Sequence, residues 1–107
     1  MRAYELMVIF SADTEESAVQ TFVNRLGDMA KEANGSLEKL EKWGVRRFAY
    51  EMNKAREGFY VVVEFLAPNA LTEVDRTLRL ADEVIRHKFI RLPLDEAHRR
   101  GLAGATV

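Results

Sequence analysis

The residues best suited to chemistry lie between positions 46 and 56, where basic and aromatic side chains are mixed. They are Arg46, Arg47, Phe48, Tyr50, Lys54 and Arg56. Guanidinium groups form paired hydrogen bonds with phosphate oxygens and stack on bases, so this mixture is suited to binding RNA. The same mixture is typical of a strand edge that charge protects against aggregation. The residue types by themselves leave both interpretations open.

Groups that could catalyse a reaction or hold a metal ion are sparse. The chain contains no cysteine, which excludes disulfides, zinc fingers and thiol nucleophiles. The glycines Gly101 and Gly104 do not open a helix, as those of a phosphate-binding loop would. We therefore expect no enzyme activity, no cofactor and no metal site. For His87, which lies in a predicted strand, we expect a structural or RNA-facing role.

The charges are nearly balanced over the whole chain but unevenly placed along it. With 16 basic and 17 acidic side chains, the net charge of −1 argues against a protein that coats nucleic acid by bulk charge. Residues 39–56, however, carry six basic groups against two acidic ones, and residues 84–91 carry three basic groups and no acid. Residues 1–33 carry six acidic groups against three basic ones. A near-neutral total therefore conceals a basic face.

The hydrophobic pattern predicts four strands and two helices within one domain, since 107 residues leave no room for a second. Alternation predicts strands at residues 4–10, 36–51, 59–66 and 84–92, with a break near Gly44 and a hairpin tip at 53–58. Apolar residues at three- and four-residue steps over 19–33 and 71–81 predict two helices, the first capped by Asp13 and the second by Asn69. Residues 94–107 show no sustained period, so we expect a domain over 1–93 and a flexible C-terminal tail.

This β-α-β-β-α-β order predicts an α+β fold in which both helices cover one face of a four-stranded antiparallel sheet. The opposite, open face mixes apolar and charged residues, which is typical of a surface that binds a partner. Its apolar members are Met7, Ile9, Tyr60, Val62 and Ile90, and they are the candidates for a protein-binding face. Residues 57–64 lack the aromatics on which RNA-recognition domains stack bases, so we expect backbone and shape contacts with any RNA. No apolar run approaches the roughly 18 residues of a membrane span, and no secretion signal is evident.

One segment makes the sequence resemble a known family, the bacterial small-subunit ribosomal protein S-six. The most specific motif runs from Gly44 through the Arg46–Arg47 pair to Tyr50, and a second covers residues 78–87. The resemblance extends from Met1 to about Leu92. It implies a ferredoxin-like structural component of the cytoplasmic ribosome. As implied by the resemblance, the protein would bind the central domain of 16S ribosomal RNA together with ribosomal protein S-eighteen, as a heterodimer, with no membrane and no small-molecule substrate.

The family's motif positions supply candidate RNA-binding or partner-binding residues. Carried over onto this sequence, they are Arg2, Tyr4, Arg46, Arg47, Tyr50, Lys54, Arg79, Arg86 and His87, and the basic segments add Arg56 and Lys88. The sequence does not assign each candidate to RNA, to the partner or to the fold. Two positions depart from the family: Glu51 replaces a proline, which adds an acid to the basic strand, and Phe48 replaces a leucine.

A second hypothesis is a small ferredoxin-like ligand-binding or enzymatic domain that dimerises through its open sheet face. It is motivated by the apolar residues on that face, and it requires a pocket lined by convergent polar groups. No such set of groups is evident in the sequence. Homo-oligomerisation alone is a third hypothesis.

Overall fold

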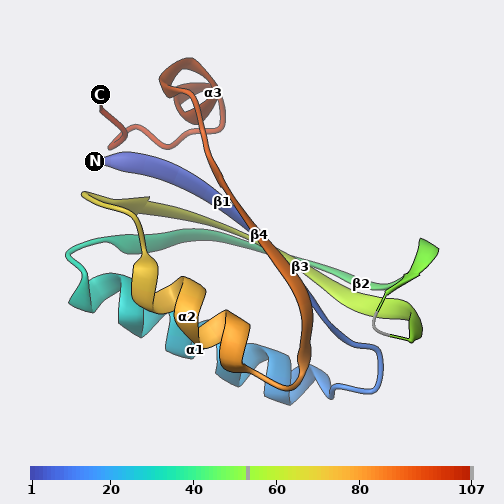
Figure 1. Ribbon diagram of the computed structural model, residues 1–107. Coiled ribbons are helices and arrows are strands. Elements are labelled where there is room, and N and C mark those ends of the chain that lie inside the picture. The colour runs from blue at the N-terminus through green and yellow to red at the C-terminus, as the bar shows by residue number, and fades with distance from the viewer. Residues whose placement is uncertain (53, 107) are drawn as a thin grey trace.

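The computed structural model describes residues 1–52 and 54–106 and contains one antiparallel sheet with helices on both sides of it (Figure 1). In chain order the elements are β1 (Arg2–Ser11), α1 (Glu16–Glu32), β2 (Ser36–Met52), β3 (Ala55–Ala67), α2 (Thr72–Leu80), β4 (Val84–Arg91) and α3 (Leu94–Arg99). The strands follow the order β2-β3-β1-β4. Helices α1 and α2 cover one face, which confirms the predicted ferredoxin-like arrangement.

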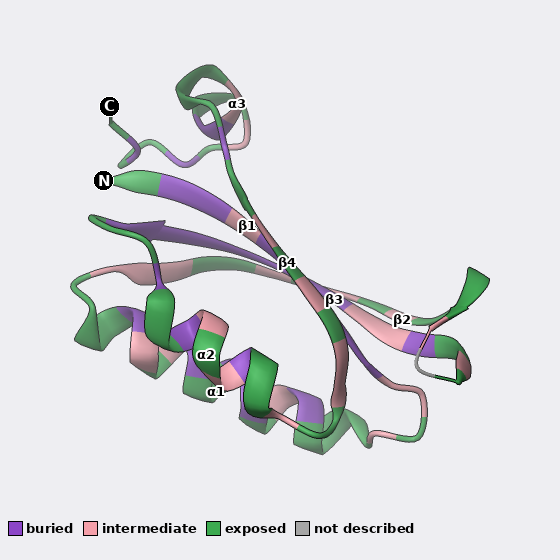
Figure 2. Ribbon diagram, in the orientation of Figure 1, coloured by how far each residue is buried: buried purple, intermediate pink, exposed green. Residues whose placement is uncertain are grey.

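The core lies between the sheet and the helices α1 and α2. Alternation along β1 turns Leu6, Val8 and Phe10 toward the helices, and all three are fully buried. Opposite them on β3 lie Val61 and Val63, which pair with β1 in register. Burial is therefore concentrated in the two central strands and the inner sides of the two helices (Figure 2). The two edge strands, β2 and β4, are left free to carry charge.

The hairpin of β2 and β3 projects beyond the rest of the sheet. The pairing of β1 with β3 ends at Ser11 and Gly58, so beyond that point β2 and β3 pair only with each other among the described residues. We call residues 46–57 the hairpin arm. The predicted tip at 53–58 is shorter in the structure, because β3 begins at Ala55 and pairs there with Met52. Asn53 of the predicted tip lies outside the described residues.

Gly44 produces the irregularity predicted in β2 without ending the strand. Its φ of +81° is left-handed, and the register of β2 against β3 shifts between Lys42 and Gly44. A bulge of this kind moves the following side chains to new positions relative to the sheet faces.

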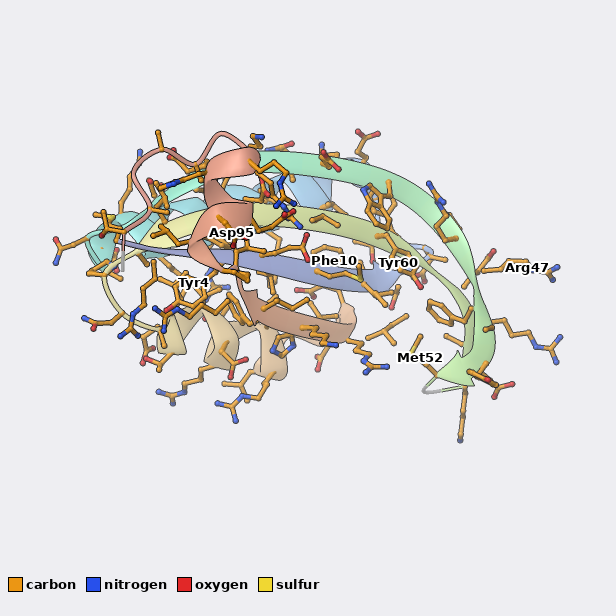
Figure 3. All side chains as sticks on the ribbon, turned by 90° about the horizontal axis from the view of Figure 1, so that it is seen from above. Tyr4, Phe10, Arg47, Met52, Tyr60 and Asp95 are labelled. Atoms are coloured by element: carbon orange, nitrogen blue, oxygen red, sulfur yellow. The ribbon has the colours of Figure 1, made fainter. Side chains whose placement is uncertain are left out.

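The C-terminal segment, residues 94–106, has regular structure where the sequence pattern predicts none. It forms α3 and then a chain that buries Ala97, Leu102 and Ala105 against Ala3, Leu66 and Leu92. In Figure 3 this segment lies over the open face, on the opposite side of the sheet from α1 and α2. The prediction that this segment has no regular structure is therefore wrong. Three buried small or aliphatic side chains hold it against the sheet, and the segment is too short for its hydrophobic residues to show a period. The boundary at residue 93 and the mobility of the segment in solution stay predictions.

Gly58 is required by close approach of the backbone, and its replacement is a direct test of the hairpin geometry. A Cβ at this position would lie 2.5 Å from Cγ2 of Ile9 and 2.9 Å from the carbonyl oxygen of Phe10. We expect Gly58→Ala to lower the free energy of unfolding by about 1–3 kcal/mol, since the carbonyl cannot rotate away. Denaturant unfolding measures this, with Gly27→Ala as the control.

Gly27 lies inside α1, where a Cβ would meet Leu37 at an ordinary 3.7 Å. The control variant should therefore be neutral or more stable by up to about 1 kcal/mol. Equal stability of the two variants would show that the approach at Gly58 is not tight.

Candidate functional site

The two adjacent arginines of the hairpin arm belong to opposite faces of the sheet. Arg46 pairs in register with Gly58 on the open face, and Arg47 pairs with Glu57 on the other face. Both are exposed, and Arg47 extends away from the body of the protein (Figure 3). The arm therefore presents one guanidinium on each side, as the alternation of a strand requires.

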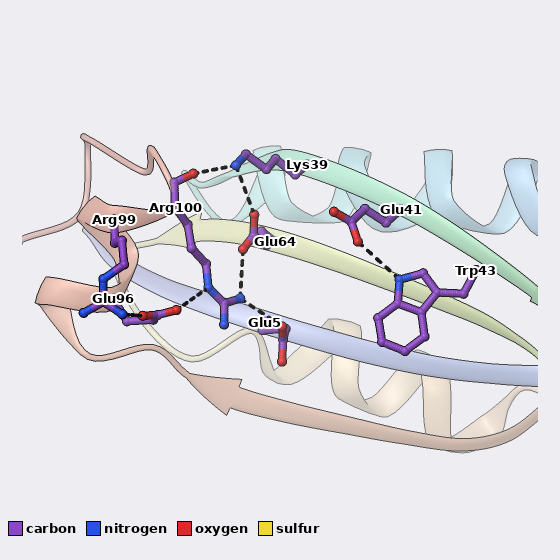
Figure 4. A network of polar contacts seen from close by, with 8 residues as sticks. All are labelled: Glu5, Lys39, Glu41, Trp43, Glu64, Glu96, Arg99 and Arg100. Atoms are coloured by element: carbon purple, nitrogen blue, oxygen red, sulfur yellow. Dashed lines mark hydrogen bonds and ion pairs between the residues drawn. The ribbon is translucent and has the colours of Figure 1, made fainter.

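An aromatic cluster lies on the open face at the base of the hairpin arm. The rings of Trp43 and Tyr60 are stacked at 6.2 Å with an interplanar angle of 6°, and Phe48 lies 6.2 Å from Tyr60. The guanidinium carbon of Arg46 lies 5.7 Å from the centre of the Trp43 ring, which is a cation–π contact. Trp43 is 42% exposed, and its indole N–H donates to Glu41 at 3.2 Å (Figure 4).

Trp43 is absent from the candidate residues predicted from the sequence. Alternation from Leu40 and Glu41, which pair with Val63 and Val62, places Trp43 on the open face. The bulge at Gly44 then brings Arg46 to the same face. The signal that could have identified its contact with Arg46 is Gly44, because a glycine inside a strand often marks a bulge, and a bulge here puts residues three positions apart on one face.

The end of the hairpin arm carries the most exposed candidates. Tyr50 is 83% exposed, and Lys54 adopts a left-handed φ of +64° at the turn. Arg56 is paired only loosely with Glu51, at 4.0 Å between Nε and Oε2, and both side chains are largely exposed. Such surface pairs contribute little energy, so the acid at position 51 reduces the charge of the arm without locking Arg56 in place.

Strand β4 adds two further cations to the open face. Arg86 and Lys88 pair with Ile9 and Met7 of β1, and both are exposed. Together with Met52 and Tyr60 these residues line a shallow hollow of ≈ 220 Å³. The hollow and the aromatic cluster adjoin through Tyr60, so apolar, aromatic and cationic groups share one half of the open face.

Two candidates, Tyr4 and His87, have side chains that are largely packed inside the fold. Tyr4 is only 7% exposed and belongs to the core, because it lies on the same side of β1 as Leu6 and Val8. His87 faces α2, where its Nε2 lies 2.7 Å from Oδ1 of Asp75. Burial leaves little of the Tyr4 side chain to contact a ligand, and the contact with Asp75 turns the His87 ring toward α2. The binding roles of both residues stay predictions.

Two other basic candidates lie outside the open face. Arg79 on α2 forms an ion pair with Asp75 at 3.1 Å, and Arg2 is exposed at the start of β1, where it pairs in register with Ala67. These positions separate both residues from the hairpin arm. The structure therefore does not bring all the predicted basic residues together.

The apolar candidates for a protein-binding face differ in what they can offer. Ile90 is 41% exposed, and Met7 and Tyr60 are partly exposed. Ile9 and Val62 are buried, with exposed fractions of 5% and 8%. A partner could therefore contact Ile90, Met7 and Tyr60 directly, while the other two support the surface from below.

The other half of the open face is acidic and is occupied by Arg100 (Figure 4). Nη1 of Arg100 donates to Glu5 at 2.9 Å and to Glu64 at 3.0 Å, while its Nε donates to Glu96 at 3.0 Å. The carboxylates of Glu5, Glu64 and Glu96 raise the pKa of Arg100 above its ordinary value. Its hydrogen bond in turn lowers the pKa of Glu96. The C-terminal segment is thus fixed to the sheet by charge as well as by apolar contact.

Among residues 1–52 and 54–106, no group of three or more acidic or histidine side chains is placed to hold a metal ion. Over the same described residues, every helix is too short or too polar to cross a bilayer.

Comparison with known proteins agrees with this picture. The family model for ribosomal protein S6 matches residues 3–91. The "Small ribosomal subunit protein bS6" of Desulforamulus reducens is 41% identical over 92 residues, which cover 85% of this chain and 97% of that protein. The protein of the same name from Salinispora tropica is 45% identical over 92 residues, covering 85% and 96%.

A solved structure is similar over nearly the whole chain. The crystal structure of 30S ribosomal protein S6 from Thermotoga maritima superposes with a TM-score of 0.80 at 31% identity, covering 96% of this chain and 97% of that one. Family model, relatives and structure agree with the resemblance carried by the Gly44–Tyr50 motif. The chain therefore belongs to the ribosomal protein S6 family.

Proposed function

We propose that this protein binds the central domain of 16S ribosomal RNA together with ribosomal protein S-eighteen, as a heterodimer that joins the assembling small subunit. The coarser statement follows from the family: the chain is a structural component of the small ribosomal subunit, located on the ribosome in the cytoplasm, and is not an enzyme. The second hypothesis, an enzymatic or ligand-binding domain, is thereby set aside.

The observation that carries the RNA part of the proposal is the hairpin arm. It holds Arg46, Arg47, Lys54 and Arg56 beyond the body of the sheet, and all four are exposed. A projecting element with cations on both faces can contact phosphates on two sides of a folded RNA. Tyr50, largely exposed beside them, adds a ring on which an unpaired base can stack.

The protein part of the proposal is supported by the near-neutral charge and by the open face. A net charge of −1 supplies little phosphate neutralisation by itself, so a basic partner that completes the binding surface fits the composition. The exposed apolar positions Ile90, Met7 and Tyr60 offer that partner a contact area opposite the helices.

Filter binding with an RNA fragment of the 16S central domain tests the proposal. We expect the protein with S-eighteen to bind the fragment more tightly than either protein alone, with affinity falling as salt rises. Sedimentation of the two proteins without RNA should show a one-to-one complex. Absence of both the complex and the RNA binding, at about 0.1 M salt, would contradict the proposed function.

A further inference from the structure

The C-terminal segment lies on the same open face as the apolar residues that the proposed function assigns to a protein partner. Residues 94–106 lie on the open face, with Ala97, Leu102 and Ala105 buried against Ala3 and Leu66 of the sheet. A hydrogen bond also connects the end of the segment to the start of the chain: the Thr106 amide donates to the Met1 carbonyl at 2.6 Å. Any protein that covers this end of the sheet must meet the segment or displace it.

Arg100 fills a site that the sheet itself constructs. Glu5 and Glu64 are direct cross-strand partners of β1 and β3, and like charges directly opposite each other destabilise a sheet. Glu64 is only 7% exposed, and a carboxylate this deeply buried requires a cation as its partner. One nitrogen of the Arg100 guanidinium meets both carboxylates (Figure 4).

Lys39, a second cation near this pair, cannot replace Arg100 equally well. Nζ of Lys39 lies 3.8 Å from Glu64 and donates to the backbone carbonyl of Arg100. The Lys39 side chain is half exposed and contacts only one of the two carboxylates. If Arg100 leaves, Glu5 loses its ion-pair partner among the described residues, and Glu64 keeps only the longer contact with Lys39.

We propose that Glu5 and Glu64 form a guanidinium-binding site on the open face, which Arg100 occupies in the free chain and an arginine of the basic protein partner occupies in the complex. The C-terminal segment is then a built-in competitor of the partner. This inference rests on the proposed function for the identity of the partner. RNA is a poor occupant of this end of the face, because two carboxylates repel phosphate, whereas the hairpin arm at the other end attracts it.

The competitor is tested first in the free, full-length protein by hydrogen exchange. The amides of Leu102 and Ala105 donate to carbonyls of the segment itself, and the amide of Thr106 donates to Met1. We expect Arg100→Ala to increase the hydrogen-exchange rate of these three amides by about tenfold or more. Arg99→Ala is the matched control, since Arg99 pairs only with Asp95 and Glu96 of its own helix among the described residues. Equal protection in wild type and Arg100→Ala would overturn the proposal, whatever the partner is.

The site is tested next by affinity for S-eighteen. We expect Arg100→Ala to bind S-eighteen about tenfold more tightly than wild type does, because the partner's arginine then need not displace Arg100 from Glu5 and Glu64. Glu5→Gln/Glu64→Gln should bind about tenfold more weakly, and adding Arg100→Ala to it should change nothing further. Glu32→Gln/Glu73→Gln, which removes two exposed carboxylates from α1 and α2, is the charge-matched control. Equal affinity of Arg100→Ala and wild type would overturn the proposal.

A peptide titration separates failure of this inference from failure of the proposed function. If no variant binds S-eighteen, the proposed partner is wrong, and the site is judged by titrating Arg100→Ala with an arginine-containing peptide. Shifts of the NMR amide signals at Glu5 and Glu64 that vanish in the Glu→Gln pair support the site. Equal shifts with the matching lysine peptide, or none with either, overturn it. Thermal melting of each variant establishes that the sheet remains folded.

Discussion

Reversing Arg46 and Arg47 together, as Arg46→Glu/Arg47→Glu, is expected to weaken binding of the 16S fragment by about 100-fold at about 0.1 M salt. The two guanidiniums lie on opposite faces of the hairpin arm and are both exposed, so each can form its own phosphate contact. Losing two such contacts should also reduce the slope of log affinity against log salt by about two.

The same change should leave stability nearly unaltered. Neither arginine is buried, and among the described residues the specific side-chain contact to be lost is the cation–π pair of Arg46 with Trp43, worth about 0.5–1 kcal/mol. Arg25→Glu/Arg76→Glu is the control, because it changes the net charge equally on the exposed sides of α1 and α2. Filter binding and thermal melting measure both quantities. Equal loss of RNA affinity in the two double variants would show that net charge matters and the hairpin arm does not.

Phe65→Ala is expected to lower the free energy of unfolding by about 3–5 kcal/mol. Phe65 is fully buried on β3, paired on one side with Tyr4 of β1 and on the other with Leu37 of β2. Its removal therefore leaves a cavity where the two strands and the helices meet. For a domain of this size the melting temperature should fall by more than about 10 °C.

Leu80→Ala provides the comparison for this second prediction. Leu80 is also a large apolar residue, but it is 71% exposed at the end of α2. Its replacement should change stability by less than about 0.5 kcal/mol. Denaturant titration of both variants measures the two changes in the free energy of unfolding. The dependence of that free energy on denaturant concentration is compared with the wild-type value. A small effect at Phe65 would mean that the core collapses around the lost ring.

Much of the fold could be predicted because it depends on local periods. Alternation in β1 and β3, and the three- and four-residue steps of α1 and α2, identify the elements, their order and the covered face of the sheet. The same alternation already places Tyr4 beside Leu6 and Val8 in the core. Matching a family motif selects residues that matter to the family without separating those that bind from those that only pack.

The parts that could not be predicted depend on contacts between distant residues. The C-terminal segment is held by Arg100, which meets carboxylates 95 and 36 positions away in the chain, and no periodic pattern reports such a contact. The contact of Arg46 with Trp43 depends on a bulge at Gly44, which shifts the alternation of β2 by one residue. In both cases a single residue decides the geometry, so a pattern averaged over several residues misses it.

The position of β1 at the centre of the sheet has a consequence during synthesis. Of the four strands, β1 leaves the ribosomal tunnel first. Its neighbours in the sheet are β3 and β4, and the residues that pair with it begin only at Gly58 and at Val84. At about 5–20 residues per second, several seconds separate translation of β1 from that of β4. For that interval the nascent chain exposes one of its most apolar stretches, Leu6 to Phe10, which makes it a target for chaperones that bind emerging hydrophobic segments.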